Sequence, residues 1–315
     1  MHCAPQRQGF YRKAKTCLSK ESLLNMAKAY NAALYDHSNT QTVAPQIVGG
    51  TGVKVFQNNK LHKPIPLSGS RAKLWNHLQR RFMHLCDKNE SCWLEIDFIK
   101  KSVNGVEDEF RPVKPTEWNS NPHTWLNNFN IEDVMEQYEE SHPSFHFVGV
   151  FPMDFAATDP LGKCVSEEMC KIDVRKLMKA GIMQMGVVLN LDKHTESGSH
   201  WVALYANFDP KKPNYGIYYY DSNGMEPTKE VVAFKNSIKH QIDAMDPNAT
   251  KKFPIEYNKR RHQYGNSECG VFCMYFLERC LLGISFKKIE SSKIYDKKVH
   301  KLRNKYFRPN KHAKP

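Results

Sequence analysis

The sequence predicts an α+β fold for the larger part of the chain, preceded by a small, mainly helical N-terminal domain. Two features predict this fold: short apolar segments recur between residues 145 and 257, and a longer apolar run extends from Cys269 to Leu281. The run has no two-residue alternation, is longer than an ordinary strand, and is closed by Gly283. We therefore expect a helix that is buried on nearly all sides. Strands followed by a central helix are typical of α+β domains.

Residues 1–115 are expected to form the helical N-terminal domain. Apolar residues at three- and four-residue spacing predict a helix over residues 20–35, and Ser70 is the expected N-cap of a second helix. Residues 92–99 are apolar at mixed spacing, which leaves their state open. Two prolines after residue 110 indicate a domain boundary near residue 115.

Residues 116–286 are expected to form the α+β domain. Two of its strands are separated by a short loop with Pro210 and Pro213, so we expect them to pair as a hairpin. In chain order the expected elements are a helix from Thr124-Trp125-Leu126-Asn127 to Glu140, a strand over 145–151, a helix over 174–180, strands over 185–190, 200–206 and 216–221, a helix with Pro227 in its first turn, and a strand over 253–257.

The composition excludes several classes of protein. Of 315 residues, 40% are hydrophobic, so the chain can bury a core. The nine cysteines are odd in number and contain no CxxC pair, which argues against a disulfide framework and against a zinc ribbon. No apolar stretch approaches 18 residues, and residues 1–20 lack the apolar segment of a signal peptide. We expect a protein of a reducing compartment that neither is secreted nor spans a membrane.

The net charge of +13 is concentrated at the two ends of the chain. Residues 287–315, a basic C-terminal segment, carry a balance of +9, and residues 1–20 carry +5, so the remainder is near neutral. Basic ends of this kind can bind nucleic acid non-specifically by neutralising phosphates. Solvated tails that only aid solubility are an equal alternative.

Cys269 stands where a polar loop becomes the expected buried helix. The first turn of a helix favours negative charge, so a thiol at this position is shifted toward the thiolate, which attacks carbonyl groups. The alternative is an ordinary core cysteine, which is how we interpret Cys273 and Cys280 further along the same helix.

Three other residues complete a possible catalytic arrangement. His200 begins one strand and Asp221 ends the next, so pairing of the two strands would bring these side chains within reach of each other. A thiolate, an imidazole and an acceptor that orients the imidazole are the groups of a cysteine protease. Gln263, six residues before Cys269, could donate to the developing oxyanion. Each residue alone has a simpler explanation. His200 could be a surface or core histidine with its hydrogen bonds made within the fold, and Asp221 could be a turn residue.

Five blocks of sequence stand out together between residues 118 and 283. They are Thr124-Trp125-Leu126-Asn127, Gly186-Val187-Val188-Leu189-Asn190, Gly198-Ser199-His200-Trp201, Tyr219-Tyr220-Asp221-Ser222 and Gln263-Tyr264-Gly265-Asn266-Ser267-Glu268-Cys269-Gly270. These blocks resemble the ubiquitin-like-protein protease family, over roughly residues 118–283. That family includes SUMO-specific proteases, the adenovirus protease and the virion-maturation proteases of large DNA viruses, and this chain looks most like the poxvirus and African swine fever virus relatives.

The resemblance implies a papain-like, adenain-like core with a central sheet and a buried nucleophile helix. It implies a catalytic triad of His200, Asp221 and Cys269, with Gln263 as oxyanion donor and no metal or cofactor. By motif position it makes Trp125 and Trp201 the walls of an aromatic lid, with ordinary core tryptophans as the alternative.

The substrates implied by the resemblance are polypeptides cleaved after small residues, commonly at Gly-Gly or Ala-Gly sites. Two flat indoles leave room for a peptide backbone but not for a Cβ. Processing of viral structural polyproteins, in a virion or the host cytoplasm, is the first expectation, and removal of SUMO- or ubiquitin-like modifiers is the alternative. Gly49-Gly50-Thr51 then becomes a candidate self-processing site, although an ordinary glycine-rich turn explains it as well.

Two other classes of protein fit part of the pattern. The order His–Asp–Cys also occurs in the chymotrypsin-like cysteine proteases of small RNA viruses, but these place the nucleophile between barrel strands rather than on a helix. A non-catalytic virion protein that binds nucleic acid through its basic ends is the second alternative. The presence of all four catalytic residue types weighs against it.

Overall fold

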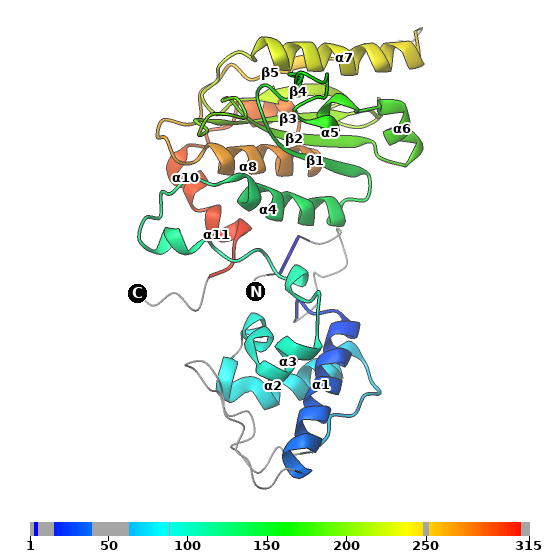
Figure 1. Cartoon of the computed structure of the whole chain (residues 1–315), viewed down its shortest axis with the longest axis vertical. Helices are drawn as coiled ribbons and strands as arrows, with labels where there is room; N and C mark the ends of the chain where they lie inside the picture. Colours follow the sequence, from blue (N-terminus) through cyan, green and yellow to red (C-terminus); the bar gives the residue numbers. More distant parts are fainter. Residues whose placement is uncertain (1–2, 6–15, 40–62, 88, 248–251, 310–315) are drawn as a thin grey trace. The chain divides into compact units, whose positions relative to one another are not determined.

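A computed structural model describes residues 3–5, 16–39, 63–87, 89–247 and 252–309. The chain divides into two compact units, Met1–Pro112 and Val113–Pro315, and each is described by itself (Figure 1). The candidate self-processing site at Gly49-Gly50-Thr51 lies outside the described residues.

The first unit is helical in its described residues. The two predicted helices are confirmed: α1 spans Lys20–Asn39 and α2 spans Arg71–Cys86, with Ser70 capping α2 by accepting from the Lys73 N–H. The segment left open by the sequence forms the 3-10 helix η2 (Glu90–Glu95) and α3 (Asp97–Ser102), and η3 (Glu107–Glu109) follows. One apolar cluster holds these helices together, including Leu23, Met26, Tyr30, Leu74, Leu78, Phe82 and Trp93.

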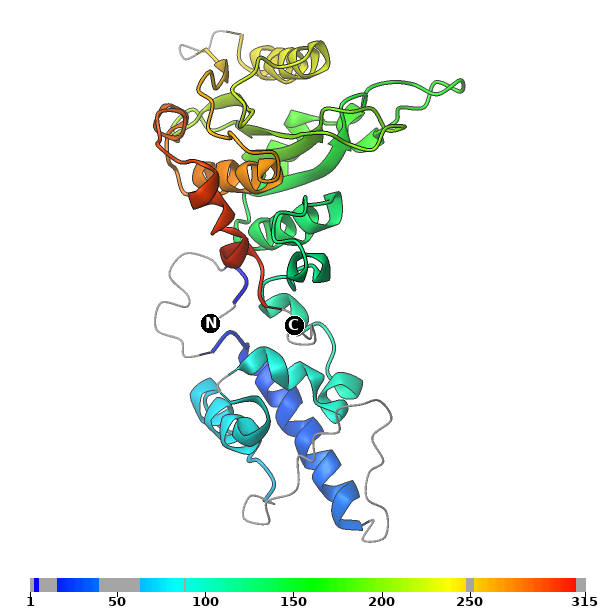
Figure 2. The ribbon, with the colours of Figure 1, turned by 90° about the vertical axis from the view of Figure 1, so that its left-hand side faces the viewer.

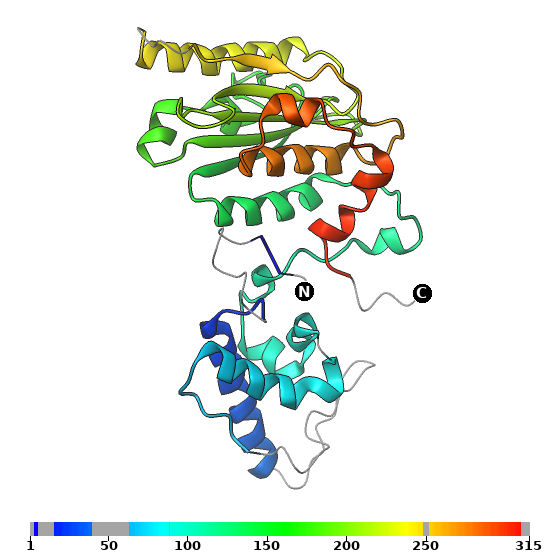
Figure 3. The ribbon, with the colours of Figure 1, turned by 180° about the vertical axis from the view of Figure 1, so that it is seen from behind.

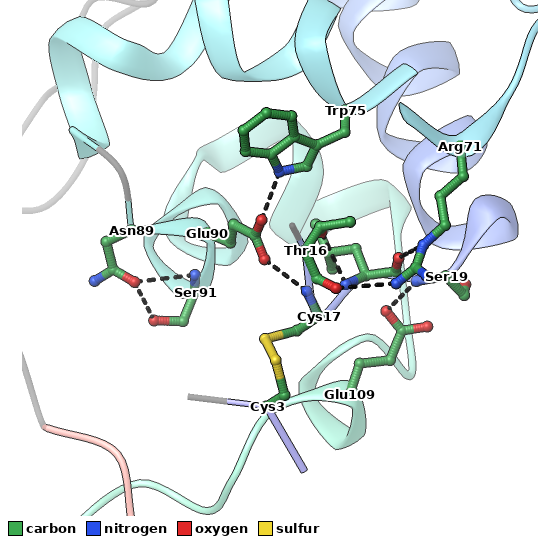
Figure 4. The surroundings of a disulfide bond; sticks show 11 residues. Cys3, Thr16, Cys17, Ser19, Arg71, Trp75, Asn89, Glu90, Ser91 and Glu109 are labelled. Atoms are coloured by element: carbon green, nitrogen blue, oxygen red, sulfur yellow. Dashed lines mark hydrogen bonds between the residues drawn. A yellow bond between two sulfur atoms is a disulfide. The ribbon is translucent and has the colours of Figure 1, made fainter. Parts of the chain in front are cut away.

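A buried carboxylate anchors the segment that precedes α1 (Figure 4). Glu90 accepts hydrogen bonds from the backbone N–H of Cys17, at 2.9 Å, and from the Trp75 indole N–H. Arg71 donates to the Leu18 carbonyl at 2.6 Å. Burial of a carboxylate without hydrogen-bond donors would cost free energy, so loss of these contacts would destabilise the unit. The contacts therefore fix residues 16–19 against α2 and η2.

Three disulfides contradict the expectation that the chain lacks a disulfide framework. They join Cys3 to Cys17, Cys86 to Cys92 and Cys164 to Cys170, with Cα–Cα separations of 5.0, 5.5 and 6.6 Å. These separations lie within the range that a disulfide bridges, and the cysteine count alone could not reveal them. The three free cysteines, Cys269, Cys273 and Cys280, all belong to one helix.

The second unit contains a mixed five-stranded sheet in the order β1-β2-β3-β4-β5. Its strands are β1 (Phe145–Pro152), β2 (Gln184–Asn190), β3 (Trp201–Asn207), β4 (Gly216–Tyr220) and β5 (Ile255–Tyr257). The predicted hairpin is confirmed, because β3 and β4 pair antiparallel. β2 and β3 are also antiparallel, whereas the outer pairs β1–β2 and β4–β5 are parallel.

Helices cover both faces of the sheet, as Figures 1, 2 and 3 show. α7 (Lys229–Met245) covers one face, and α8 (Cys269–Leu281) covers the other, with α4 (Asn128–Ser141) beside it. Alternate residues of β3 divide between the two layers: Val202, Leu204 and Ala206 belong to the cluster with α7, and Ala203 and Tyr205 to the cluster with α8. This arrangement is the expected α+β architecture.

α8 is the predicted central helix, with the predicted bounds. Most of its residues are buried, and Gly283 beyond its end has a φ of +72°, a conformation that glycine adopts readily. The other expected helices are also present: α4 begins after Asn127, and α6 spans Val174–Lys179. Pro227 lies just outside α7, because Thr228 is its N-cap. Two short elements, η4 (Thr116–Asn119) and α5 (Glu167–Cys170), were not expected.

The basic C-terminal segment packs into the second unit as far as it is described. It contains α9 (Phe286–Glu290) except for its first residue, and all of α10 (Asp296–His300) and α11 (Arg303–Tyr306). Their apolar side chains join the cluster around α8, so they are not solvated tails. The sequence did not predict this packing because the apolar positions are few and irregularly spaced among lysines. The buried positions are Phe286, Ile289, Ile294, Val299, Tyr306 and Phe307.

Among the described helices, none has both the length and the apolar character needed to span a bilayer.

Candidate active site

The topology brings three of the predicted residues to one edge of the sheet. His200 lies directly before β3 and Asp221 directly after β4. The two strands are antiparallel, with Ala203 opposite Tyr220, so the start of one lies beside the end of the other. Cys269 is the first residue of α8, which packs across β3.

His200 and Asp221 form a buried pair. His200 Nε2 lies 2.7 Å from Asp221 Oδ1, and the Asp221 side chain is 1% exposed. The same carboxylate oxygen accepts the backbone N–H of Asn223 at 2.8 Å. Asn258 holds the aspartate backbone from both sides, because its Oδ1 accepts the Asp221 N–H and its Nδ2 donates to the Asp221 carbonyl. Asp221 is therefore fixed in the orientation that meets the imidazole.

The surroundings of His200 favour its protonated form. Burial disfavours the charge and lowers the pKa, but hydrogen bonds to Asp221 and Cys269, together with attraction to the charges of both groups, outweigh burial. The pKa of His200 is raised to about 9. Because Nε2 faces Asp221, the second ring nitrogen, Nδ1, is left for Cys269.

The three free thiols of α8 differ in their surroundings. The Cys269 thiol is close enough to His200 to help raise the pKa of the imidazole, and it lies in the first turn, where backbone N–H groups lack partners within the helix. Cys273 and Cys280 lie deeper, and burial raises the pKa of each thiol well above its ordinary value. They remain protonated, which agrees with their interpretation as core cysteines.

Gly270 allows close packing at the start of α8. A Cβ at this position would lie 3.1 Å from Leu126 Cδ1 and 3.3 Å from Ile131 Cδ1. The absence of a side chain therefore lets the first turn of α8 approach the segment that leads into α4.

Gln263 is buried and held by its neighbours. The Ser222 hydroxyl donates to Gln263 Oε1 at 2.7 Å, and Gln263 Nε2 donates to the Gly265 carbonyl at 3.0 Å. Its backbone N–H bonds to the Ser222 carbonyl. Since Ser222 follows Asp221, the loop that carries the candidate oxyanion donor is tied directly to the residue after the acid.

The two tryptophans occupy different environments. Trp125 is 42% exposed, whereas Trp201 is 8% exposed and belongs to the core cluster around α8. The Trp201 indole N–H donates to the Leu126 carbonyl at 3.0 Å. Trp201 therefore fixes the backbone next to Trp125, and the two indoles are not equivalent walls of a lid.

Glu268, which precedes Cys269, is a residue that the motifs included without giving it a role. Its buried carboxylate accepts from Arg303 Nε at 2.8 Å, and His300 Nδ1 lies 2.9 Å from its other oxygen. Arg303 also donates to the carbonyls of Ser267 and Thr124. The C-terminal helices thus hold the start of α8. No sequence signal indicated these contacts, because His300 and Arg303 follow Glu268 by 32 and 35 residues in the chain.

Comparison with known proteins adds a second line of argument. Residues 187–314 match the Ulp1 protease family, C-terminal catalytic domain. The chain is 30% identical to a protein of Acanthamoeba polyphaga mimivirus named as a thiol protease, over 97% of this chain and 93% of that protein. It is 27% identical to an African swine fever virus protein named as a SUMO-1 cysteine protease, over 75% of this chain and 88% of that protein.

The fold is shared with a solved structure. The crystal structure of an African swine fever virus protease matches with a TM-score of 0.59 at 18% identity, over 98% of this chain and 96% of that chain. At this identity the likeness shows the fold alone.

Fold, motifs and relatives together define a cysteine protease, a hydrolase that acts on polypeptides. The chain belongs to the Ulp1 protease family, and the predicted family is confirmed.

Proposed function

We propose that this cysteine protease uses Cys269 as nucleophile, His200 as its proton acceptor and donor, Asp221 to orient His200, and Gln263 to stabilise the oxyanion. The observation that carries the assignment is the position of His200, whose Nε2 lies 2.7 Å from the Asp221 carboxylate and whose pKa is raised by both Asp221 and Cys269. Proximity of the three groups is what an activated thiol requires.

The arrangement supports acyl transfer in two steps. The Cys269 thiolate attacks the scissile carbonyl carbon, and the His200 imidazolium then protonates the departing amine, which leaves an acyl-enzyme. Neutral His200 next takes a proton from water, and the resulting hydroxide attacks the thioester. The thiolate leaves, and the imidazolium is restored. Asp221 keeps the ring oriented and stabilises its charge throughout.

Gln263 suits the oxyanion role because its amide is already oriented. An amide nitrogen carries two N–H groups, and one is committed to Gly265. We assign the second to the oxygen of the tetrahedral intermediate, together with the backbone N–H of Cys269. Donors fixed in advance stabilise the developing charge without reorganising during the reaction.

The tryptophans support a preference for small residues, commonly Gly-Gly or Ala-Gly, before the scissile bond. Trp125 is exposed and lies next to Leu126, which packs against Gly270 beside the nucleophile. We propose that Trp125 contacts the substrate backbone and that Trp201, adjacent to His200, holds Trp125 through its bond to Leu126.

The biological substrate we propose is a viral structural polyprotein, processed during virion maturation in the virion or the host cytoplasm. The two relatives reported above come from large DNA viruses, which supports this role. The name SUMO-1 cysteine protease favours the alternative, cleavage of a SUMO- or ubiquitin-like modifier. Incubation with Gly-Gly-X and Ala-Gly-X peptides, in parallel with ubiquitin-like precursors, separates the two roles.

The nucleophile assignment is tested by paired substitutions. Cys269→Ala should abolish peptide cleavage and labelling by an alkylating peptide, whereas Cys273→Ala, one turn away on the same helix, should keep both. Labelling of another cysteine first, or turnover by Cys269→Ala, would overturn the assignment.

We also propose that the basic C-terminal segment binds nucleic acid non-specifically. Two of its basic residues are engaged internally, Arg303 with Glu268 and Lys305 with Glu278. Exposed lysines on and around α9 and α10 support the proposal: Lys287, Lys288, Lys293, Lys297, Lys298 and Lys301.

A further inference from the structure

Four polar atoms converge beside the first turn of α8, outside the triad. Glu268 Oε1 lies 2.9 Å from His300 Nδ1, 3.8 Å from His123 Nδ1 and 3.1 Å from Ser267 Oγ. Ser267 Oγ lies 3.5 Å from His123 Nδ1. We call these four residues the His123 cluster. Its two histidines and its glutamate offer ligand atoms that all lie within 4.8 Å of one another.

These separations match those of a tetrahedral metal site. Ligand bonds of about 2.0–2.1 Å at tetrahedral angles place the ligand atoms about 3.3 Å apart. The four separations of the His123 cluster, from 2.9 to 3.8 Å, lie on both sides of that value. We propose that the cluster binds a divalent transition-metal ion, zinc in particular, through His123, Glu268 and His300, with Ser267 or water as the fourth ligand.

The two imidazoles approach one carboxylate oxygen from different segments of the chain. Both present Nδ1 to the same carboxylate oxygen, and their ring centroids lie 4.6 Å apart. His123 Nδ1, at 3.8 Å from the carboxylate, is too distant for a direct hydrogen bond.

Arg303 organises the segments that carry the ligands. It bonds to Glu268 Oε2 and so leaves Oε1 for the cluster. It also donates to the carbonyl of Ser267 and to that of Thr124, the residue after His123. A carboxylate held in this way by an outer partner is the arrangement that orients metal ligands in protein sites.

Binding requires that Nδ1 of each histidine present a lone pair to the ion. A hydrogen on Nδ1 would therefore move through solvent to Nε2 of the same ring. The ion then links the loop before α4, the start of α8 and α10. Since these segments separate on unfolding, the ion stabilises the folded protein without contacting the triad.

The experiment uses the full chain with Cys269→Ala, which removes the catalytic thiol as a competing ligand. Zinc affinity is measured by calorimetry and by the rise in Tm, and Co²⁺ serves as a spectroscopic probe of ligand type and geometry. His123→Ala and His300→Ala are added separately. His194→Ala is the matched control, because His194 also pairs with a carboxylate, Asp154, but lies outside the cluster.

The proposal expects one zinc ion per chain in the Cys269→Ala protein and in the His194→Ala control, with a tetrahedral Co²⁺ spectrum. Removing either cluster histidine should weaken binding by more than about 100-fold, since loss of an outer partner alone costs roughly 10- to 100-fold. His123 is 64% exposed, so its substitution tests the site even if His300→Ala fails to fold. Unchanged affinity in His123→Ala, a sulfur-to-cobalt charge-transfer band, or no stoichiometric binding would each overturn the proposal.

Discussion

The pKa of His200 is raised, although burial alone would lower it. Two partners, the Asp221 carboxylate and the Cys269 thiol, raise its pKa to about 9 despite burial. An imidazole with this pKa is charged at neutral pH, whereas in the unfolded chain, with a pKa near 6.5, it is mostly neutral. Its contribution to stability is therefore complete below pH 6.5 and is lost as the pH rises through about 9.

The same pKa predicts the pH dependence of catalysis. We expect kcat/KM of the wild-type protein to fall on the alkaline side near pH 9, as the imidazolium that protonates the leaving group is lost. Asp221→Asn removes the negative charge that favours the imidazolium, so the alkaline limb should move to lower pH and the maximum should fall. Glu226→Gln is the control, because the Glu226 carboxylate accepts a hydrogen bond from Tyr257 rather than from His200. If the alkaline limb of Asp221→Asn stays at the wild-type pH, that limb belongs to a group other than His200.

At the residue scale, the sequence predicted four groups of a candidate site but not what holds them. Cys269, His200, Asp221 and Gln263 could be proposed because their chemistry and order in the chain are informative. Asn258 acts through hydrogen bonds that exist once the fold has formed. The same holds for Ser222, Glu268 and Arg303. Asn, Ser and Glu in loops are common, so their residue type alone indicates nothing.

At the scale of elements, the start of α8 depends on the C-terminal helices. Glu268 and Arg303 are 3% and 4% exposed, so removal of the arginine leaves a buried carboxylate without its main donor. We expect Arg303→Leu to destabilise the second unit by about 3–5 kcal/mol, the usual result of breaking a buried pair from one side. Urea unfolding monitored by hydrogen exchange in α8 measures the change.

Lys301→Ala is the control for this substitution, because it removes an exposed charge from the same segment and should shift stability little. The variant Glu268→Gln with Arg303→Leu should recover part of the loss, since the unpaired charge is removed as well. A loss of stability no larger in Arg303→Leu than in Lys301→Ala would contradict the anchoring role.

The contact between Trp201 and Leu126 predicts substrate specificity. If Trp125 closes over the substrate backbone, a methyl group forced into the site costs about 1–3 kcal/mol, or roughly 5- to 150-fold in rate. Changing the glycine nearest the scissile bond to alanine should lower kcat/KM by that factor in the wild-type protein. Trp125→Ala should reduce this discrimination, and Trp201→Ala should do the same through loss of the bond to Leu126.

The measurement is the ratio of kcat/KM for Gly-Gly-X and Gly-Ala-X peptides on the three proteins. Trp93→Phe, in the core of the first unit, is the control for loss of a buried indole. Wild-type ratios in both Trp125→Ala and Trp201→Ala would mean that specificity arises elsewhere, and the triad assignment would stand.

Elements were predictable where one periodicity extended over several turns or a whole strand. α1, α2, α7 and the hairpin of β3 and β4 are of this kind, whereas α8 was predicted from the length of its apolar run. α9, α10 and α11 are four or five residues long, and each buries one or two residues. A segment of that length has no period to detect, and its lysines dominate the composition.

For the whole molecule, the packing of the C-terminal segment changes how its charge can be tested. Deletion of residues 287–315 would remove Ile289, Ile294, Val299 and Tyr306 from the core around α8. The resulting protein would lose folding as well as charge. Substitution of exposed lysines is therefore the informative change, since long charged side chains at the surface contribute little to stability.

The proposed nucleic-acid binding gives a prediction about salt. Each phosphate that is no longer neutralised after removal of a lysine lowers the slope of log affinity against log salt by about 0.9 for duplex DNA. Changing Lys287, Lys288, Lys297 and Lys298 together to Gln should therefore flatten the slope by up to about 3.6 and weaken binding at low salt.

The control is the double variant Lys211→Gln with Lys212→Gln, which changes two exposed lysines in the loop between β3 and β4. This variant should leave the salt slope unchanged. Because counterion release depends on charge near the duplex and not on base sequence, the loss should be equal for unrelated DNA sequences. An unchanged slope in the fourfold variant would assign these lysines to solubility alone, and peptide cleavage by that variant would show that the protease unit had stayed folded.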